Sequence, residues 1–165
     1  TLWGYGYNST LGLVPTNPAV FAGPVQIGVR TDWKLVACYY PANPVLGSFI
    51  AMTDDGTLWW MKQAEPAPAQ LTFTQVGLDQ EWRTVVAGSG YYLAIKKNGT
   101  LWAWGNNYAG KLGDGTTTVR LEPVQIGAYT DWMTLPEGMM TSTSMAIKKD
   151  GSLWAWGLGA NGTLV

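Results

Sequence analysis

The sequence predicts an all-β fold, a partial β-propeller of about three four-stranded blades plus an orphan N-terminal strand, and internal repetition is the first reason. The segment PVQIG stands at residues 24–28 and returns unchanged at residues 123–127, with FTQVG between them at residues 73–77. A tryptophan follows five residues after the glycine of each copy, at Trp33, Trp82 and Trp132. These tryptophans are 49 and 50 residues apart, a spacing that fits one four-stranded blade for each repeat.

Short turn signals are the second reason. The dipeptides at residues 55–56, 98–99 and 150–151 read DG, NG and DG. Two-residue type I′ hairpin turns prefer these residues, because both central positions need positive φ. Gly, Pro and Thr interrupt every helical window, and no apolar stripe of period 3.6 persists. Each repeat is therefore expected to hold four short strands.

A two-residue turn at residues 98–99 also predicts the register of its hairpin. It places Ile95 opposite Trp102 and Leu93 opposite Trp104, because side chains alternate along a strand. Tryptophan recurs at this place in other repeats. We therefore interpret these indoles as core residues rather than as a stacking surface for sugars or bases.

Complete four-stranded units are predicted within a single domain of residues 1–165. They span residues 24–62, 71–105 and 123–157, with residues 1–6 as the orphan last strand of a further blade and residues 158–165 as a trailing loop. A propeller ring needs at least four blades, so the open ends would expose apolar sheet faces. The chain, which starts at Thr1, is therefore expected to be a processed protein or a fragment of a longer one, or a subunit whose copies complete a ring or join end to end.

Composition limits the possible functions. Charged residues make up 13% of the chain, and Lys plus Arg (10) nearly balance Asp plus Glu (11), so no basic surface for nucleic acid is indicated. No histidine occurs, which excludes imidazole-based zinc sites and catalytic triads. No apolar run approaches the roughly 18 residues of a membrane span. The single cysteine, Cys38, follows the apolar residues KLVA and is interpreted as a buried core thiol.

The stretch GNNYAGKLGDGTTT, residues 105–118, has most of the spacing of a phosphate-binding P-loop. However, Lys111 is followed by Leu112 rather than by Ser or Thr, and GDGTTT cannot open a helix. The corresponding loop of the last repeat has Thr163 where Lys111 stands. We therefore expect no nucleotide or other cofactor, and interpret the stretch as the crossing between two blades, with Leu112 as a small plug and Asn107 bonding backbone groups.

Variable loops on a rigid frame are common binding sites, and three such loops are expected on one face, at residues 7–23, 63–70 and 106–122. An aromatic anchor with charged neighbours is a common composition of binding hot spots. The candidate partner-binding residues are Tyr108, Lys111, Asp114 and Arg120, together with Tyr39 and Tyr40 of the insertion at residues 39–47.

No catalytic or metal-binding residues are assigned. Asp54 and Asp55 belong to a turn, and Asp114 lacks the alternating acidic ligands of a calcium loop. The lysine pairs at residues 96–97 and 148–149 precede hairpin turns and are interpreted as solvated tips. No nucleophile, base and oxyanion donor can be combined, so an enzyme is not expected.

The segments GTLWAWGNNYAGKLGDGTTTVRLEPVQIGAYTDW and AIKKDGSLWAWG resemble the bacterial form of the regulator of chromosome condensation repeat. The resemblance covers nearly the whole chain but is poor at residues 57–71, which lack the WGxN element. It implies four-stranded blades, usually seven to a ring. The family includes exchange factors for a small GTPase, a secreted inhibitor of β-lactamases and many interaction surfaces, so function follows only loosely.

We therefore expect a non-catalytic protein-interaction or assembly module, either part of a larger propeller or a self-assembling subunit. Its partner would be another protein or further copies of itself. A surface that is polar through Thr, Ser, Asn and Gln favours an extracellular or cell-surface location, with the cytoplasm left open. The alternatives are a lectin-like propeller that stacks Tyr and Trp on carbohydrate and, third, a nucleotide-hydrolysing enzyme.

Overall fold

The computed structural model describes residues 1–7, 20–39, 48–63, 71–137 and 142–158. Within these residues the strands form four antiparallel sheets, numbered here in chain order. The first sheet contains β1 (Leu2–Tyr7) and β2 (Val20–Ile27). The second contains β3 (Trp33–Tyr39), β4 (Ser48–Thr53), β5 (Leu58–Gln63) and β6 (Leu71–Gln75). The third contains β7 (Trp82–Gly88), β8 (Tyr91–Lys96), β9 (Leu101–Gly105) and β10 (Arg120–Gln125). The fourth contains β11 (Trp132–Thr134), β12 (Thr143–Lys148) and β13 (Leu153–Gly157).

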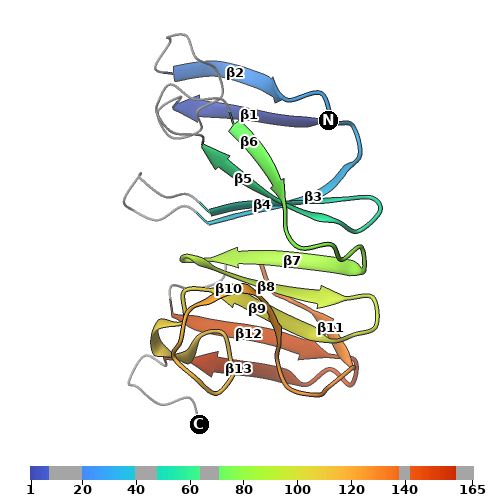
Figure 1. Cartoon of the computed structure of the whole chain (residues 1–165), viewed down its shortest axis with the longest axis vertical. Helices are drawn as coiled ribbons and strands as arrows, with labels where there is room; N and C mark the ends of the chain where they lie inside the picture. Colours follow the sequence, from blue (N-terminus) through green and yellow to red (C-terminus); the bar gives the residue numbers. More distant parts are fainter. Residues whose placement is uncertain (8–19, 40–47, 64–70, 138–141, 159–165) are drawn as a thin grey trace.

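The sheets follow one another along the long axis of the molecule, with the N-terminus and the C-terminus at opposite ends (Figure 1). One short 3₁₀ turn, η1 (Tyr108–Gly110), lies between β9 and β10. This architecture confirms the predicted all-β fold and partial propeller.

The strands group one position later than the predicted units at residues 24–62, 71–105 and 123–157. The PVQIG-type strands β2, β6 and β10 each complete the preceding sheet instead of opening the next one. The N–H of Val76 donates to the carbonyl of Leu58, and the N–H of Ile126 to that of Leu101, both at 2.8 Å. The predicted orphan strand, β1, consequently has a partner in β2.

The PVQIG-type strands β2, β6 and β10 all pair with the strand before them in the same register. In each of the first three sheets, a tryptophan of that preceding strand stands opposite a glutamine of the PVQIG-type strand. The pairs are Trp3 with Gln26, Trp59 with Gln75, and Trp102 with Gln125. The PVQIG-type strand therefore pairs with the strand before it in the same way in each of these three sheets.

The predicted hairpin register is wrong by one residue. Ile95 pairs with Leu101 and Ala94 with Trp102. The turn has three residues. The backbone carbonyl of Lys96 accepts a hydrogen bond from the N–H of Gly99, and the backbone N–H of Lys96 donates to the carbonyl of Thr100. A type I turn followed by a glycine with positive φ gives this geometry, and Gly99 has φ of 82°. The extra residue shifts every later pair of the hairpin.

Two apolar cores lie between successive sheets. Ile50, Met52 and Leu58 of the second sheet pack with Trp82 and Trp104 of the third. A second cluster joins the third sheet to the fourth and includes Leu93, Leu101 and Leu112 on one side and Trp132 and Ala146 on the other. The prediction that the tryptophans after the hairpin turns form the core is confirmed for Trp104, whereas Trp102 is half-buried and Trp3 and Trp154 of the end sheets are exposed.

Cys38 is exposed, so its interpretation as a core thiol is wrong. Strand β3 alternates between two environments: Leu35 and Ala37 pack against the core, and Val36 and Cys38 point away from it. The apolar run KLVAC concealed this alternation, because its outward positions are occupied by Val and Cys.

Adjacent sheets are also joined at the hairpin turns. The first tryptophan of a sheet donates its backbone N–H to the carbonyl of the glycine in the hairpin turn of the previous sheet. The bonds are Trp82 to Gly56 at 3.3 Å and Trp132 to Gly99 at 3.1 Å. A Cβ on Gly99 would lie 2.0 Å from the carbonyl oxygen of Thr130. The chain of the next sheet therefore passes directly over these turns.

Candidate interaction surface

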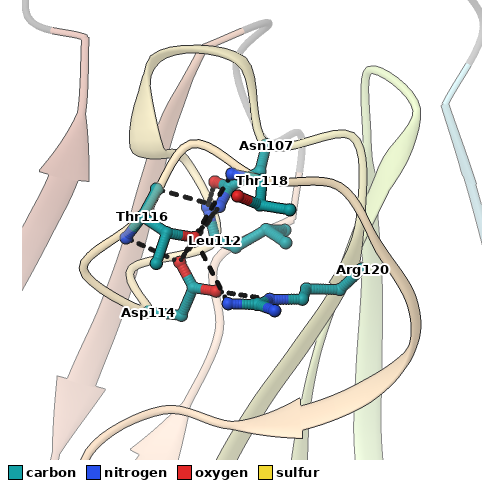
Figure 2. A network of polar contacts seen from close by, with 6 residues as sticks. All are labelled: Asn107, Leu112, Asp114, Thr116, Thr118 and Arg120. Atoms are coloured by element: carbon teal, nitrogen blue, oxygen red, sulfur yellow. Dashed lines mark hydrogen bonds and ion pairs between the residues drawn. The ribbon is translucent and has the colours of Figure 1, made fainter.

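The loop between β9 and β10 is organised around Asn107, whose side chain is fully buried. Its Oδ1 accepts a hydrogen bond from the N–H of Leu112 at 2.9 Å, and its Nδ2 donates to Asp114 Oδ1 at 3.0 Å and to the carbonyl of Thr116 at 2.9 Å (Figure 2). Leu112 is completely buried in the core between the third and fourth sheets. The roles predicted for Asn107 and Leu112 are therefore confirmed.

Asp114 and Arg120 come together in the same network. Arg120 Nε lies 2.7 Å from Asp114 Oδ2, and Thr116 donates both its N–H and its hydroxyl to Asp114 Oδ1 (Figure 2). Burial alone would raise the pKa of Asp114, but the hydrogen bonds from Arg120, Thr116 and Asn107 together lower it to about 2. Both charges are thus used to hold the loop in shape.

This carboxylate makes the stability of the protein depend on pH. Its native pKa of about 2 lies below the value near 3.9 of an unfolded Asp, so its contribution is complete above about pH 4 and is lost as the pH falls towards 2. We expect the free energy of unfolding to fall more steeply over this range in the wild type than in Asp114→Asn. Denaturant titrations at a series of pH values would measure it, and parallel curves for the two proteins would contradict the assignment.

Lys111 points into the protein rather than towards a partner. Its Nζ donates to the carbonyl of Ser89 at 2.8 Å and lies 4.8 Å from the ring centre of Tyr91. The residue is only 4% exposed, and this burial lowers the pKa of the ammonium group. Its carbonyl accepts from Ser144 Oγ and from Trp156 Nε1 of the fourth sheet. Lys111 therefore connects neighbouring sheets, a use of the lysine that differs from phosphate binding.

Tyr108 is the candidate that the structure leaves accessible, with 71% of its surface exposed. It belongs to η1, and its N–H donates to Asn106 Oδ1 at 2.8 Å, which holds the backbone that carries the ring. Beside it, Ala109, Gly110 and residues of the 113–118 segment line a shallow hollow of about 720 Å³. A fixed backbone with an exposed aromatic ring is suited to protein contact.

The two remaining candidates are tyrosines of the insertion at residues 39–47. Tyr39 is half-buried at the end of β3, and Tyr40 lies outside the described residues. The loops at residues 8–19 and 64–70 also lie outside them, so the expected common face of three loops stays a prediction.

Sequence reasoning missed a set of cations held by aromatic rings. Lys96 Nζ lies 3.8 Å from the ring centre of Trp102, and Lys148 Nζ lies 3.1 Å from that of Tyr129. Arg30 stacks at 4.4 Å on Trp59 in the second sheet. The interpretation of the lysine pairs as solvated tips is wrong for Lys96 and Lys148, whose side chains are only 12% and 5% exposed, but is confirmed for Lys97 and Lys149, which are exposed. The signal available in the sequence was the presence of Lys before the turns at residues 98–99 and 150–151 and of Trp after them.

In the described part of the chain, no group of three or more Cys, Asp or Glu side chains could hold a metal ion. No helix within those residues is long and apolar enough to cross a membrane.

Antiparallel sheets stacked in chain order, the first three of them each ending in a PVQIG-type strand, define a segment of a β-propeller repeat protein. Residues 82–111 and 98–138 match models of the regulator of chromosome condensation (RCC1) repeat. These matches cover residues 82–138 and support the assignment of the chain to the RCC1-repeat family. The more specific resemblance to its bacterial form stays a prediction.

The relatives agree with this assignment. The mitochondrial RCC1 domain-containing protein RUG3 of Arabidopsis thaliana is 28% identical over 148 residues, which cover 79% of this chain and 32% of that protein. Human WBSCR16 superposes with a TM-score of 0.70 at 18% identity, over 97% of this chain and 43% of that one. Yeast RCC1 (Prp20), solved with Kap60 bound, gives a TM-score of 0.66 at 15% identity, over 96% of this chain and 37% of that one. The chain spans between 2% and 32% of the length of such curated relatives.

Proposed function

We propose that this chain is a non-catalytic protein-binding module whose partner contacts the loop at residues 106–122 through Tyr108. The observation that carries the proposal is an exposed aromatic ring on a loop that internal hydrogen bonds and an ion pair hold in place. Asn107, Asp114 and Arg120 hold the loop, so little conformational entropy would be lost when a partner binds.

The relatives support contact with protein as the common use of this fold. Yeast RCC1 (Prp20) was solved with the protein Kap60 bound to it. The partner of the present chain is proposed only as a protein, because low identity carries the fold but not the binding residues. The extracellular location and the alternative of carbohydrate binding stay predictions from the sequence.

Photo-crosslinking from position 108 would test the proposal. Benzoylphenylalanine in place of Tyr108 should capture a partner that can be identified, purified and titrated against the unmodified chain. Truncation of a central aromatic contact is expected to weaken such binding at least about tenfold in Tyr108→Ser.

Leu78→Ser is the matched control. Leu78 is 92% exposed, and it lies in the turn after β6, near the hairpin-turn end of the sheets rather than near the loop. This variant should bind as the unmodified chain does. Equal affinity of Tyr108→Ser and the unmodified chain, or capture of glycans in place of proteins, would contradict the proposal.

A further inference from the structure

Asn98 stands in the hairpin turn of the third sheet and is followed by glycine. Its side chain is exposed, whereas Gly99 and Thr100 behind it are buried. Asparagine is a chemically labile residue. An asparagine followed by glycine can lose its side-chain ammonia, because glycine has no Cβ to keep its backbone nitrogen away from the asparagine side chain.

We propose that Asn98 is a deamidation site that reacts when its turn opens locally. Its aspartyl product keeps the turn intact, whereas its isoaspartyl product disrupts the contact between the third and fourth sheets. The site is separate from the Tyr108 surface, because the turn and the loop at residues 106–122 lie at opposite ends of β9.

The reaction needs only water and hydroxide. The backbone nitrogen of Gly99 gives its proton to hydroxide and forms a bond to Cγ of Asn98. The bond from Cγ to Nδ2 breaks, and the leaving nitrogen takes a proton from water and departs as ammonia. Water then opens the five-membered imide. Cleavage between the ring nitrogen and Cγ gives aspartate, and cleavage between that nitrogen and the backbone carbonyl carbon gives isoaspartate, whose main chain runs through Cβ and Cγ.

The folded turn restrains both reacting groups. The N–H of Gly99 donates to the carbonyl of Lys96 at 2.9 Å. Asn98 Oδ1 accepts from the N–H of Thr100 at 3.1 Å and from its hydroxyl at 2.7 Å. The same hydroxyl accepts from Trp102 Nε1 at 2.8 Å. Deamidation therefore requires these bonds to open, and its rate follows the local opening of the hairpin.

The corresponding turns of the second and fourth sheets show that this geometry accepts a carboxylate. Asp55 Oδ1 accepts from the N–H and from the hydroxyl of Thr57, both at 3.0 Å. Asp150 Oδ1 accepts from the hydroxyl of Ser152 at 2.6 Å and from its N–H at 2.9 Å. Hydrogen bonds from Thr53 and Thr57 lower the pKa of Asp55, and those from Ser152 lower the pKa of Asp150. An aspartate at position 98 would make the same bonds to the residue two positions later.

The isoaspartyl product does not fit, because it adds one methylene to the main chain directly before Gly99. The carbonyl of Gly99 accepts from the backbone N–H of Trp132 at 3.1 Å. A Cβ built on Gly99 would lie 2.0 Å from the carbonyl oxygen of Thr130, so the glycine has no room on that side. The longer turn must therefore displace the chain at residues 128–131. Trp132 belongs to the core between the third and fourth sheets, so this displacement loosens the core.

Site-resolved mass spectrometry would test the site. The chain is kept in warm, mildly alkaline buffer and is then digested at acid pH, which limits deamidation during digestion. Asn161→Gln is introduced first, because residues 161–162 are the other Asn-Gly of the sequence. Asn98 is expected to lose its amide before Asn106, which is also exposed but precedes Asn107. Equal or slower loss at Asn98 would overturn the proposal.

Thr100 tests whether the reaction passes through opening of the turn. Thr100→Val removes the hydroxyl that holds Asn98 Oδ1, and deamidation should become about three- to tenfold faster, the factor given by the loss of one hydrogen bond. Thr100→Ser keeps the hydroxyl, as Ser152 does in the fourth sheet, and should react like the unmodified chain. Equal rates in the two variants would overturn the proposal.

Hydrogen exchange would compare the two products. Asn98→Asp supplies the aspartyl form, which has the same charge as the isoaspartyl form isolated from the aged chain by chromatography. The backbone N–H of Trp132 should exchange in Asn98→Asp as in the unmodified chain. In the isoaspartyl form it should exchange about three- to tenfold faster, because one backbone hydrogen bond is lost. Equal exchange in the two forms would overturn the proposal.

Discussion

Leu112→Ala is expected to lower the free energy of unfolding by about 2–5 kcal/mol, a large share of the stability of a domain of this size. The side chain is fully buried between the third and fourth sheets, where it contacts the cluster that contains Leu101 and Trp132. Its removal leaves a cavity that Asn107 cannot fill, because that side chain is held by hydrogen bonds to Leu112, Asp114 and Thr116.

Denaturant unfolding followed by tryptophan fluorescence would measure this loss. Leu121→Ala is the control, since Leu121 ends the same loop but is 80% exposed, and its change is expected to stay within about 0.5 kcal/mol. Equal midpoints for Leu112→Ala and Leu121→Ala would show that the loop is not anchored through its leucine.

Gly99→Ala is expected to cost several kcal/mol, because two penalties combine. At φ of 82° an L side chain is strained by about 1–3 kcal/mol. The new Cβ would also lie 2.0 Å from the carbonyl oxygen of Thr130, which belongs to backbone and must move. Overpacking of this kind adds typically 1–3 kcal/mol.

Gly151→Ala separates the two penalties. Gly151 occupies the same turn position with φ of 85°, but a Cβ there meets nothing within 4 Å. In dilute solution we therefore expect only the conformational penalty in Gly151→Ala, and both penalties in Gly99→Ala. Thermal or denaturant unfolding of the two variants would compare them, and equal losses would mean that the turn at residues 128–131 does not press on Gly99.

The repeats made most of the fold predictable. Recurring glycine, tryptophan and PVQIG-type segments indicate strands and turns directly, because each is required by local backbone geometry. The grouping of strands into sheets was less accessible, since an antiparallel meander can be divided at any connection. Only the hydrogen bonds that β6 and β10 make to β5 and β9 decide it.

The site was predicted in part. Asn107 and Leu112 were found because the loop would need a polar centre and an apolar anchor. The use of Lys111 was not predictable, since the carbonyl of Ser89 that it contacts is 22 residues away in the chain. The rings around Lys96 and Lys148 were indicated only in part, because Tyr129 lies outside the hairpin of Lys148 and meets it only when the turn at residues 128–131 packs there.

The two apolar cores each involve only neighbouring sheets, and this sets the order in which the molecule opens. Of the described sheets, the third is covered on both faces, by residues such as Ile50 of the second sheet on one side and Trp132 of the fourth on the other. We therefore expect the described sheets to open as a linear array of coupled units, with the third sheet opening after its neighbours. The backbone amides of β8 would then exchange with solvent most slowly.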